Sequence, residues 1–216
     1  GYTALTRTSI GAMSHDTNAP TTLVWFRDDL RLHDNAALAW AARRGRVVGV
    51  YVHETVGRPM GAAARWWLGR SLEHLRQQLS APLIEAEGDP REIIPRLAQR
   101  FNAAVTWNRR YRLTDIDAQV KEATGAVSHP GFLLTEPWEV RTGSGTPYRV
   151  FTPFSKKAQG MLLDAPPSPT PAPAVEGLEG VEWASTSVDE PESSATLAAH
   201  CTPGAVSYTH LRAHET

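Results

Sequence analysis

The 216-residue sequence has almost no cysteine, since Cys201 is the only one. A single thiol excludes an internal disulfide and a metal site built from several cysteines, and it is typical of a cytoplasmic protein. The longest apolar runs, Ala36–Ala42 and Val47–Val52, are far shorter than the roughly 20 residues that a membrane span needs. No basic segment followed by an apolar stretch opens the chain, which argues against secretion. We therefore expect a cytoplasmic protein without membrane contact.

Lysine and arginine are almost absent from the last quarter of the chain. Residues 1–157 hold 21 Lys and Arg against 15 Asp and Glu, whereas residues 158–216 hold one Arg and eight Asp and Glu. The net charge of −1 is therefore the sum of a basic first part and an acidic last part, which differ in character. The arginines of the first part form no single basic stripe, so the sequence gives only weak support for direct DNA binding by this segment.

Common ligand-binding motifs are also missing. The sequence contains neither G-x-G-x-x-G after its first apolar run nor G-x-x-x-x-G-K-[ST], so the usual phosphate-binding loops are excluded. It has no G-x-S-x-G elbow. The eight histidines are scattered along the sequence, so we expect no metal site.

The sequence divides into four parts. Residues 1–20 show no periodicity and read as a disordered leader, whereas residues 21–163 carry a regular pattern and predict one α/β domain. Residues 164–205 are rich in proline and acidic residues, which predicts an extended linker. Residues 206–216 depart abruptly from the preceding pattern and look like a translated sequencing-adapter end, so we expect a non-native tail there.

Short apolar runs alternate with helical patterns along the α/β part. The runs lack strict alternation, which favours strands of a parallel sheet covered on both faces. They lie at residues 23–26, 47–52, 82–84 and 103–107. The expected helices begin after the cap residues Asp34, Asp89 and Thr114, and a further helix spans residues 62–79. Pro95 should kink the helix that follows Asp89. This order predicts a doubly wound α/β fold with a mostly parallel, five-stranded, Rossmann-like or flavodoxin-like sheet, followed by an irregular linker.

Three of the predicted strands end in polar side chains. The segments are Arg27–Asp29, His53–Glu54 and Asn108–Arg110. Ligands of open α/β sheets bind beyond the carboxyl ends of the strands, and guanidinium groups beside an amide suit a phosphate, a carboxylate or a planar heterocycle. The alternative is a solvated rim of salt-bridged loops without a ligand.

Four ordered motifs carry a family resemblance. They are T-L-V-W-F-R-D-D-L-R-L-H-D-N at residues 22–35, R-W-W-L at 65–68, W-N-R-R-Y at 107–111 and Y-R-V-F-T-P-F at 148–154. Together they resemble the DNA photolyase/cryptochrome family over about residues 20–163, and their bacterial pattern favours a deoxyribodipyrimidine photolyase.

The resemblance implies the amino-terminal antenna domain of a two-domain enzyme. In this family a larger helical domain binds FAD and the lesion, and the enzyme is a carbon–carbon lyase that splits cyclobutane pyrimidine dimers in damaged DNA with light. The dimer leaves the base stack to reach the flavin. Thr202–Ala205 resembles the entrance to that domain, so we expect a truncated, monomeric and inactive fragment whose FAD and DNA contacts lie mainly in the missing part.

The resemblance leaves the antenna chromophore open between a folate, a deazaflavin and a flavin. Folate-binding members carry an Asn-Glu pair where this chain has Thr114 and Asp115. The candidate chromophore ligands are Arg27, Asp28, His53, Glu54, Asn108, Arg109, Arg110, Thr114 and Asp115. A structural or interdomain role is expected for Asp29, Arg31, Phe151 and Phe154.

Two other functions compete with a photolyase fragment. A cryptochrome-type photoreceptor fragment would carry the same four motifs. A stand-alone nucleotide- or flavin-binding module without catalysis would share the fold, although the proline-rich linker and the Thr202–Ala205 segment argue against it.

Overall fold

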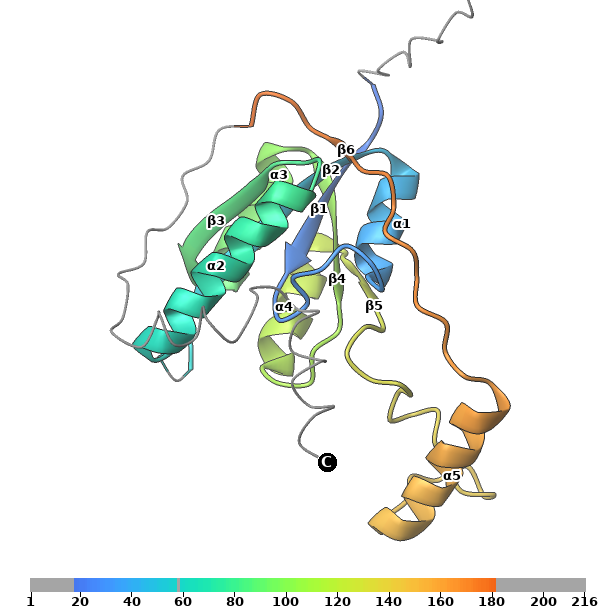
Figure 1. The fold of residues 1–216 in the computed structure, drawn as a ribbon. Helices are drawn as coiled ribbons and strands as arrows, with labels where there is room; N and C mark the ends of the chain where they lie inside the picture. Colours follow the sequence, from blue (N-terminus) through green and yellow to red (C-terminus); the bar gives the residue numbers. More distant parts are fainter. Residues whose placement is uncertain (1–17, 58, 182–216) are drawn as a thin grey trace, which may run out of the picture.

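The computed structural model describes residues 18–57 and 59–181. The predicted leader up to residue 17, the linker beyond residue 181 and the expected tail lie outside these residues. Five parallel strands form the sheet in the order β3-β2-β1-β4-β5 (Figure 1). Their bounds are β1 Thr21–Phe26, β2 Arg46–Glu54, β3 Leu83–Gly88, β4 Ala103–Asn108 and β5 Val127–His129.

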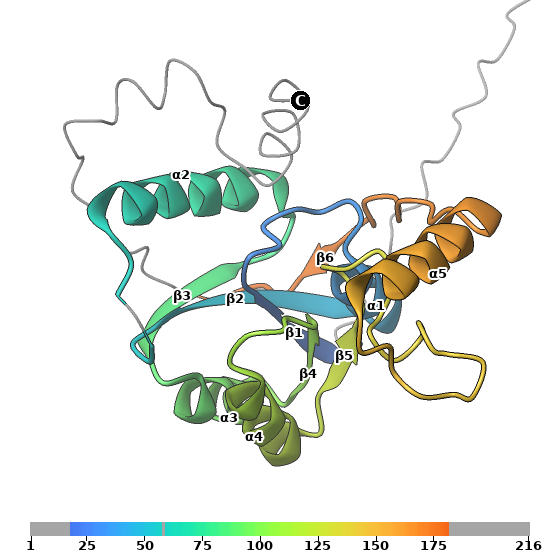
Figure 2. The same ribbon diagram turned by 90° about the horizontal axis from the view of Figure 1, so that it is seen from below.

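Helices cover both faces of this sheet. They are α1 Ala36–Arg44, α2 Ala62–Gln78, α3 Pro90–Arg100 and α4 Thr114–Thr124, followed by α5 Phe151–Asp164. The apolar residues of α1 and α2 pack on one face, and those of α3 and α4 pack on the other (Figure 2). Of the described residues, none form a helix long and apolar enough to cross a membrane.

Burial on both faces explains why the apolar runs do not alternate. All six residues of β1 are buried. Leu23 and Trp25 pack with α3 and α4, whereas Val24 and Phe26 pack with α1 and α2. A strand between two helical layers needs apolar side chains at every position. The predicted doubly wound α/β fold is confirmed.

The ends of three helices test the predicted caps. Asp89 caps α3 as predicted, since its carboxylate accepts a hydrogen bond from the backbone of Arg91. Asp34 was the wrong residue for α1, because Asn35 is the N-cap and Asp34 takes a left-handed φ of 50°. Thr114 was also the wrong cap, because it is the first residue of α4, after Leu113. Pro95 lies inside α3 as expected, and its kink stays a prediction.

Gly45 shows why α1 stops where it does. Its φ of 146° lies in a region that favours glycine, and an added Cβ would meet the Pro20 carbonyl oxygen at 2.5 Å. The chain can therefore leave α1 and enter β2 directly only with glycine at this position.

The segment after α5 returns to the sheet. Residues 165–181, which we call the return segment, run from the carboxyl edge to the amino edge beside α1 (Figure 1). Within it, β6 Glu176–Gly177 pairs with the start of β2, and the amide of Leu178 donates to the Val47 carbonyl at 3.1 Å. The first part of the predicted linker thus adds a short sixth strand.

Candidate functional site

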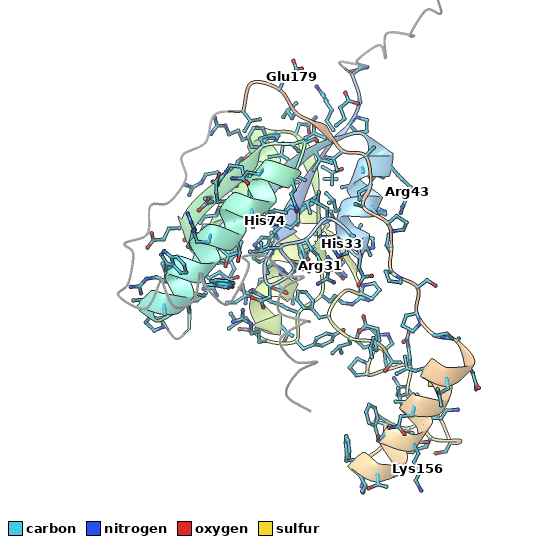
Figure 3. The ribbon with its side chains drawn as sticks, viewed as in Figure 1. Arg31, His33, Arg43, His74, Lys156 and Glu179 are labelled. Atoms are coloured by element: carbon cyan, nitrogen blue, oxygen red, sulfur yellow. The ribbon has the colours of Figure 1, made fainter. Side chains whose placement is uncertain are left out.

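The strand order reverses at β1 and β4, so the ends of these two strands form a topological switch point. The chain leaves these two neighbouring strands toward opposite faces, and ligands of doubly wound sheets bind where this happens. The loop after β1, with Arg31 and His33, lies at this edge (Figure 3). The candidate residues that follow these strands are therefore close together.

Arg27 is buried at this switch point, with 3% of its surface exposed. Its guanidinium donates to Asp117 at 3.1 Å and to the backbone carbonyl of Asn108. The guanidinium carbon lies 4.5 Å from the ring centre of Trp25 and 5.5 Å from that of Trp107. Arg27 therefore joins β1, β4 and α4 from within, by ion pairing and by cation–π contact.

Arg110 extends this arrangement to β2. It binds both carboxylate oxygens of Glu54, at 2.5 and 3.2 Å, and the carboxylate of Asp117 at 2.9 and 3.1 Å. Because Asp117 accepts from Arg27 with its other oxygen, the four side chains form one buried chain of charges. Asp117 was not among the predicted site residues, although it is the member that both arginines share.

The pKa values of the two arginines reflect this burial. Burial lowers the pKa of Arg27, although Asp117 and Asp29 act in the opposite direction. Burial alone would also lower the pKa of Arg110, but Glu54 and Asp117 together raise it above the ordinary value. Guanidinium groups stay protonated in proteins, so both charges are balanced inside the molecule.

Asn108 forms a second buried network. Its amide nitrogen donates to Asp29 at 2.6 Å and to Asn35 at 2.8 Å, and its oxygen accepts from the backbone of Ala37 at 3.0 Å. Asp29 also accepts from the backbone of Arg27 at 2.9 Å. The start of α1, where many Rossmann-like proteins bind a phosphate, is thus occupied by side chains of the protein itself.

Arg31 and Gly131 close this network on the outside. Arg31 donates to the carbonyl oxygens of Asp34 and Gly131, each at 2.9 Å. A Cβ at Gly131 would lie 2.7 Å from the Cβ of Asn108, so only glycine fits there. Asp29 and Arg31 thus use their polar atoms on other groups of the protein, and their structural role stays a prediction.

Arg109 points to another part of the chain. It donates to the buried carboxylate of Glu136 at 2.8 Å and to the Ser128 carbonyl at 2.7 Å, and it lies 5.4 Å from the ring centre of Trp138. The Tyr111 hydroxyl donates to the same Glu136 carboxylate. Partial burial and this hydrogen bond raise the pKa of Tyr111 to about 12. Glu136 was not predicted from the sequence.

His53 lies on the α2 side of the sheet. Its Nε2 is 3.1 Å from the buried carboxylate of Glu85, which also accepts from Arg76 of α2. Its ring meets that of Tyr51 edge to face, with 5.0 Å between ring centres. His53 therefore lies on the other face of the sheet from Arg27 and Arg110, which bind Asp117 of α4.

The remaining candidates form an exposed rim. Asp28 pairs with Arg112 at 2.9 Å, and both side chains are about half exposed or more. Thr114 and Asp115 are exposed in the first turn of α4. Leu113, just before them, has a left-handed φ of 54° and offers no side-chain cap to the helix.

The predicted chromophore ligands fall into two sets. In one set the polar atoms already bind other protein groups, and in the other they reach solvent. Arg27, Asn108 and Arg110 are buried and use their polar atoms on other protein groups, so they do not fit a ligand that enters from solvent. The exposed pair Asp28 and Arg112, with Thr114 and Asp115, offers oxygen acceptors and guanidinium donors that fit a polar heterocycle. No group of three or more His, Cys, Asp and Glu in the described part of the chain could hold a metal ion.

Phe151 and Phe154 lie away from this edge, on α5. Phe151 is 75% exposed, whereas Phe154 is half-buried with its ring centre 6.5 Å from that of Tyr148. Phe151 and Phe154 thus lie apart from the chromophore candidates, whereas Asp29, expected to share their structural or interdomain role, contacts Asn108.

Comparison with known proteins decides the family. The family model described as DNA photolyase matches residues 22–174, which is more than half of the chain. The chain belongs to the DNA photolyase family. The matched region includes the whole sheet except the first residue of β1 and both residues of β6, so the buried networks lie inside the family's amino-terminal α/β domain.

Photolyases and cryptochromes both occur among the relatives. The chain is 40% identical over 163 residues to the deoxyribodipyrimidine photo-lyase of Agrobacterium fabrum, covering 70% of this chain and 34% of the relative. It is 35% identical over 165 residues to cryptochrome-2 of Arabidopsis thaliana, covering 69% of this chain and 27% of the relative. The chain thus spans about a third of the length of these two curated relatives.

A solved structure has the same fold. The crystal structure of a class III photolyase from Agrobacterium tumefaciens matches with a TM-score of 0.76 and 32% sequence identity. The match covers 93% of this chain and 45% of that chain. It confirms both the predicted family and the predicted α/β architecture.

Proposed function

We propose that the chain is the amino-terminal light-harvesting domain of a deoxyribodipyrimidine photolyase, the parent protein. The parent protein would repair cyclobutane pyrimidine dimers in DNA with light and FAD, as a carbon–carbon lyase. The family match over residues 22–174 carries this proposal, supported by photo-lyases among the relatives. In the parent, reduced FAD would lend one electron to the dimer and recover it after the two bonds break, so the reaction needs no net oxidant.

We propose two roles for the residues of the carboxyl edge. The buried networks around Asp117 and Asn108 hold the strand ends and the start of α1 in one arrangement. An antenna chromophore would contact the exposed rim, where Asp28, Thr114 and Asp115 reach solvent. Folate, deazaflavin and flavin all carry ring nitrogens and oxygens that such groups can bind.

A stand-alone nucleotide-binding module has less support from the geometry. Such a module would offer its phosphate site at the start of α1, but Asn108 and Asn35 already take the amides of Ala37 and Leu38. A cryptochrome-type photoreceptor remains the second candidate, since cryptochrome-2 of Arabidopsis matches the same domain at 35% identity.

Extending the coding sequence into the parent gene tests the proposal. The extended protein and the 216-residue chain are each mixed with DNA that contains cyclobutane dimers, and remaining dimers are counted with a dimer-specific endonuclease in light and in darkness. We expect light-dependent loss of dimers with the extended protein and none with the 216-residue chain. An extended protein that binds FAD without repair would favour the cryptochrome, and repair by the 216-residue chain would contradict the proposed domain roles.

Identifying the antenna needs a separate measurement. The chromophore released from the extended protein by heat is identified by its absorbance spectrum. Exchange of Asp115 for Asn in that protein should lower the chromophore content, whereas Glu122→Gln, at an exposed position near the other end of α4, should not. Equal chromophore content in both variants would remove Asp115 from the site.

A further inference from the structure

Trp25 and Trp107 form a buried pair of indole rings inside the sheet. They belong to β1 and β4, which are neighbouring parallel strands (Figure 1). Their ring centres are 5.4 Å apart, and their ring planes cross at 81°. Trp25 has none of its surface exposed and Trp107 has 2%, so solvent reaches neither ring. Two indoles this close exchange excitation energy before either of them emits light.

Two guanidinium groups hold this pair in place. The guanidinium carbon of Arg27 lies 4.5 Å from the ring centre of Trp25 and 5.5 Å from that of Trp107. The guanidinium carbon of Arg110 lies 5.3 Å from the ring centre of Trp25. Both arginines bind Asp117, so their positions against the rings are fixed as well. The two indoles therefore keep one relative orientation, which a defined coupling of their transition dipoles requires.

The indole nitrogen of Trp25 is buried without a hydrogen-bond partner. Buried indole N–H groups usually donate to an acceptor, and an unpaired one costs free energy. Because an indole that loses an electron also tends to release this proton, Trp25 lacks the acceptor that would favour its oxidation. The unpaired nitrogen thus disfavours electron loss from the excited ring.

The charges on the arginines act in the same direction. Both charged groups that lie against the Trp25 ring are cations. Like charges at such distances repel each other strongly in buried surroundings, so a positively charged indole is unfavourable there. Transfer of excitation energy, which moves no charge, is therefore the favoured outlet for the excited pair.

The pair lies close to the exposed rim. Asp28 follows Trp25 by three residues, and its carboxylate pairs at 2.9 Å with Arg112, which follows Trp107 by five. Three residues of chain span at most about 11 Å, so the backbone of Trp25 lies within that distance of the rim. A chromophore bound at the rim would be near enough to receive energy from an indole.

The chromophore classes that fit the rim can accept this energy. Folate, deazaflavin and flavin each absorb light at wavelengths that an excited indole emits. Energy transfer needs this overlap, a short distance and a defined orientation. The buried pair supplies the last two.

We propose that Trp25 and Trp107 form a second light-harvesting centre, which absorbs ultraviolet light and passes the excitation energy to the antenna chromophore. No bond forms or breaks and no electron leaves the pair. The inference rests on the proposed function, because its energy acceptor is the antenna of the parent protein. It gives two tryptophans of the family motifs a role in light capture besides packing.

Circular dichroism of the 216-residue chain tests the coupling. Coupled indoles give a pair of ultraviolet bands of opposite sign, and each partner is needed for it. Trp25→Phe and Trp107→Phe should therefore lose the same pair of bands. Trp138→Phe, which removes an exposed indole that also lies over an arginine, should keep it. Unchanged bands in either folded core variant would overturn the coupling, and each variant tests it independently of the other.

Excitation spectra of the extended protein test the energy transfer. Emission of the antenna chromophore is recorded against excitation wavelength and normalised to chromophore content. We expect Trp25→Phe and Trp107→Phe to lose the part of the spectrum shaped like indole absorption, and Trp138→Phe to keep it. The chromophore's own absorption is common to all variants, so the difference reports only the indoles. Equal spectra, or an extended protein without an antenna chromophore, would overturn the proposal.

Two measurements need no core variant. Indole emission of the extended protein should be shorter-lived with the antenna chromophore than after its removal, and equal lifetimes would overturn the energy transfer. A long-lived tryptophan radical after flash excitation of the 216-residue chain would mean that electrons leave the indoles, which would also overturn the proposal.

The inference and the proposed function can fail separately. Light-driven repair by an extended protein whose tryptophan variants have unchanged excitation spectra would overturn the ultraviolet role alone. Indole-sensitised chromophore emission without repair would contradict the photolyase and leave the ultraviolet role supported.

Discussion

Asp117 is the side chain that links the two buried arginines at the ends of β1 and β4. It is the first-turn carboxylate of α4 that binds both Arg27 and Arg110. An acidic residue near the start of a helix is explained equally well by the helix dipole, so the sequence offered no reason to select it over Asp115. Its partner Arg27 is 90 residues away, and this pairing becomes visible only in the fold.

Replacing Asp117 should destabilise the protein strongly. Asp117→Asn leaves two buried guanidinium groups without their shared counter-charge, and we expect a loss of about 3 kcal/mol in the free energy of unfolding. Urea unfolding followed by circular dichroism measures this loss. Asp115→Asn, two residues earlier and exposed, is the matched control and should change stability little. Equal effects of the two changes would contradict the role of Asp117.

His129 should make stability depend on pH. Burial lowers the pKa of His129 below its ordinary 6.5, and the nearby charges of Arg109 and Arg43 lower it further. Below about pH 6.5 the unfolded chain therefore binds a proton that the folded protein rejects, so stability falls as the pH decreases toward the folded pKa.

His129→Gln should remove this part of the pH dependence. The difference in unfolding free energy between about pH 7.5 and about pH 5.5 should be smaller in the variant than in the unchanged chain. His33→Gln, at an exposed position, is the control and should keep the original difference. A His129 variant with an unchanged pH dependence would show that the histidine does not carry the effect.

Among the elements, the return segment differs most from its sequence pattern. Its prolines predict a stiff linker, yet Val175 packs on one apolar core, and Leu178 and Val181 pack on the other. At Gly177 an added Cβ would lie 2.7 Å from the Cα of Ala81 and 2.9 Å from the Ser80 carbonyl oxygen. The chain thus passes close to the turn before β3.

A residue larger than glycine at position 177 should weaken the packing of β6 against the turn before β3. Gly177→Val should cost about 1–3 kcal/mol of unfolding free energy, because backbone atoms must move to admit the side chain. Gly143→Val, at a position with open space, is the control. Thermal unfolding of both variants measures the difference, and a Gly177 variant as stable as its control would mean that β6 contributes little.

The regular elements were predictable because local pattern and burial agree in them. The runs of β1, β2, β3 and β4 lie within one to four residues of the observed strands at either end. Helix α5 was not predicted, because its stripe begins without a capping side chain at Val150. β5 has only three residues, too few for a periodic signal.

Side-chain partners at the site were less predictable. The sequence indicated that Arg27, Asn108 and Arg110 lie near one edge, since the carboxyl ends of parallel strands meet there. It could not indicate that these groups bind one another, because burial depends on the loops packed over them. Glu136 lies in an irregular segment without periodicity, so nothing in the local pattern marked it as buried.

At the scale of the whole molecule, the proposed roles of the two parts of the parent protein predict which of the two proteins retains FAD. The 216-residue chain should purify without FAD, whereas the extended protein should retain it, because the FAD contacts of the proposed photolyase lie in the longer part. Fluorescence of the supernatant after heat release measures the bound flavin. Stoichiometric FAD on the 216-residue chain would contradict the assignment.

The amino edge of the sheet has a consequence for protein engineering. Arg46 donates to the Ala19 carbonyl at 2.9 Å and pairs in register with Glu176, so one residue holds both ends of the described fold. A unit whose entry and exit lie side by side can be spliced into a surface loop of a host protein without stretching either chain. Residues 18–181 are therefore a candidate for insertion into a host protein as one unit. Arg46 would lie beside both junctions with the host chain.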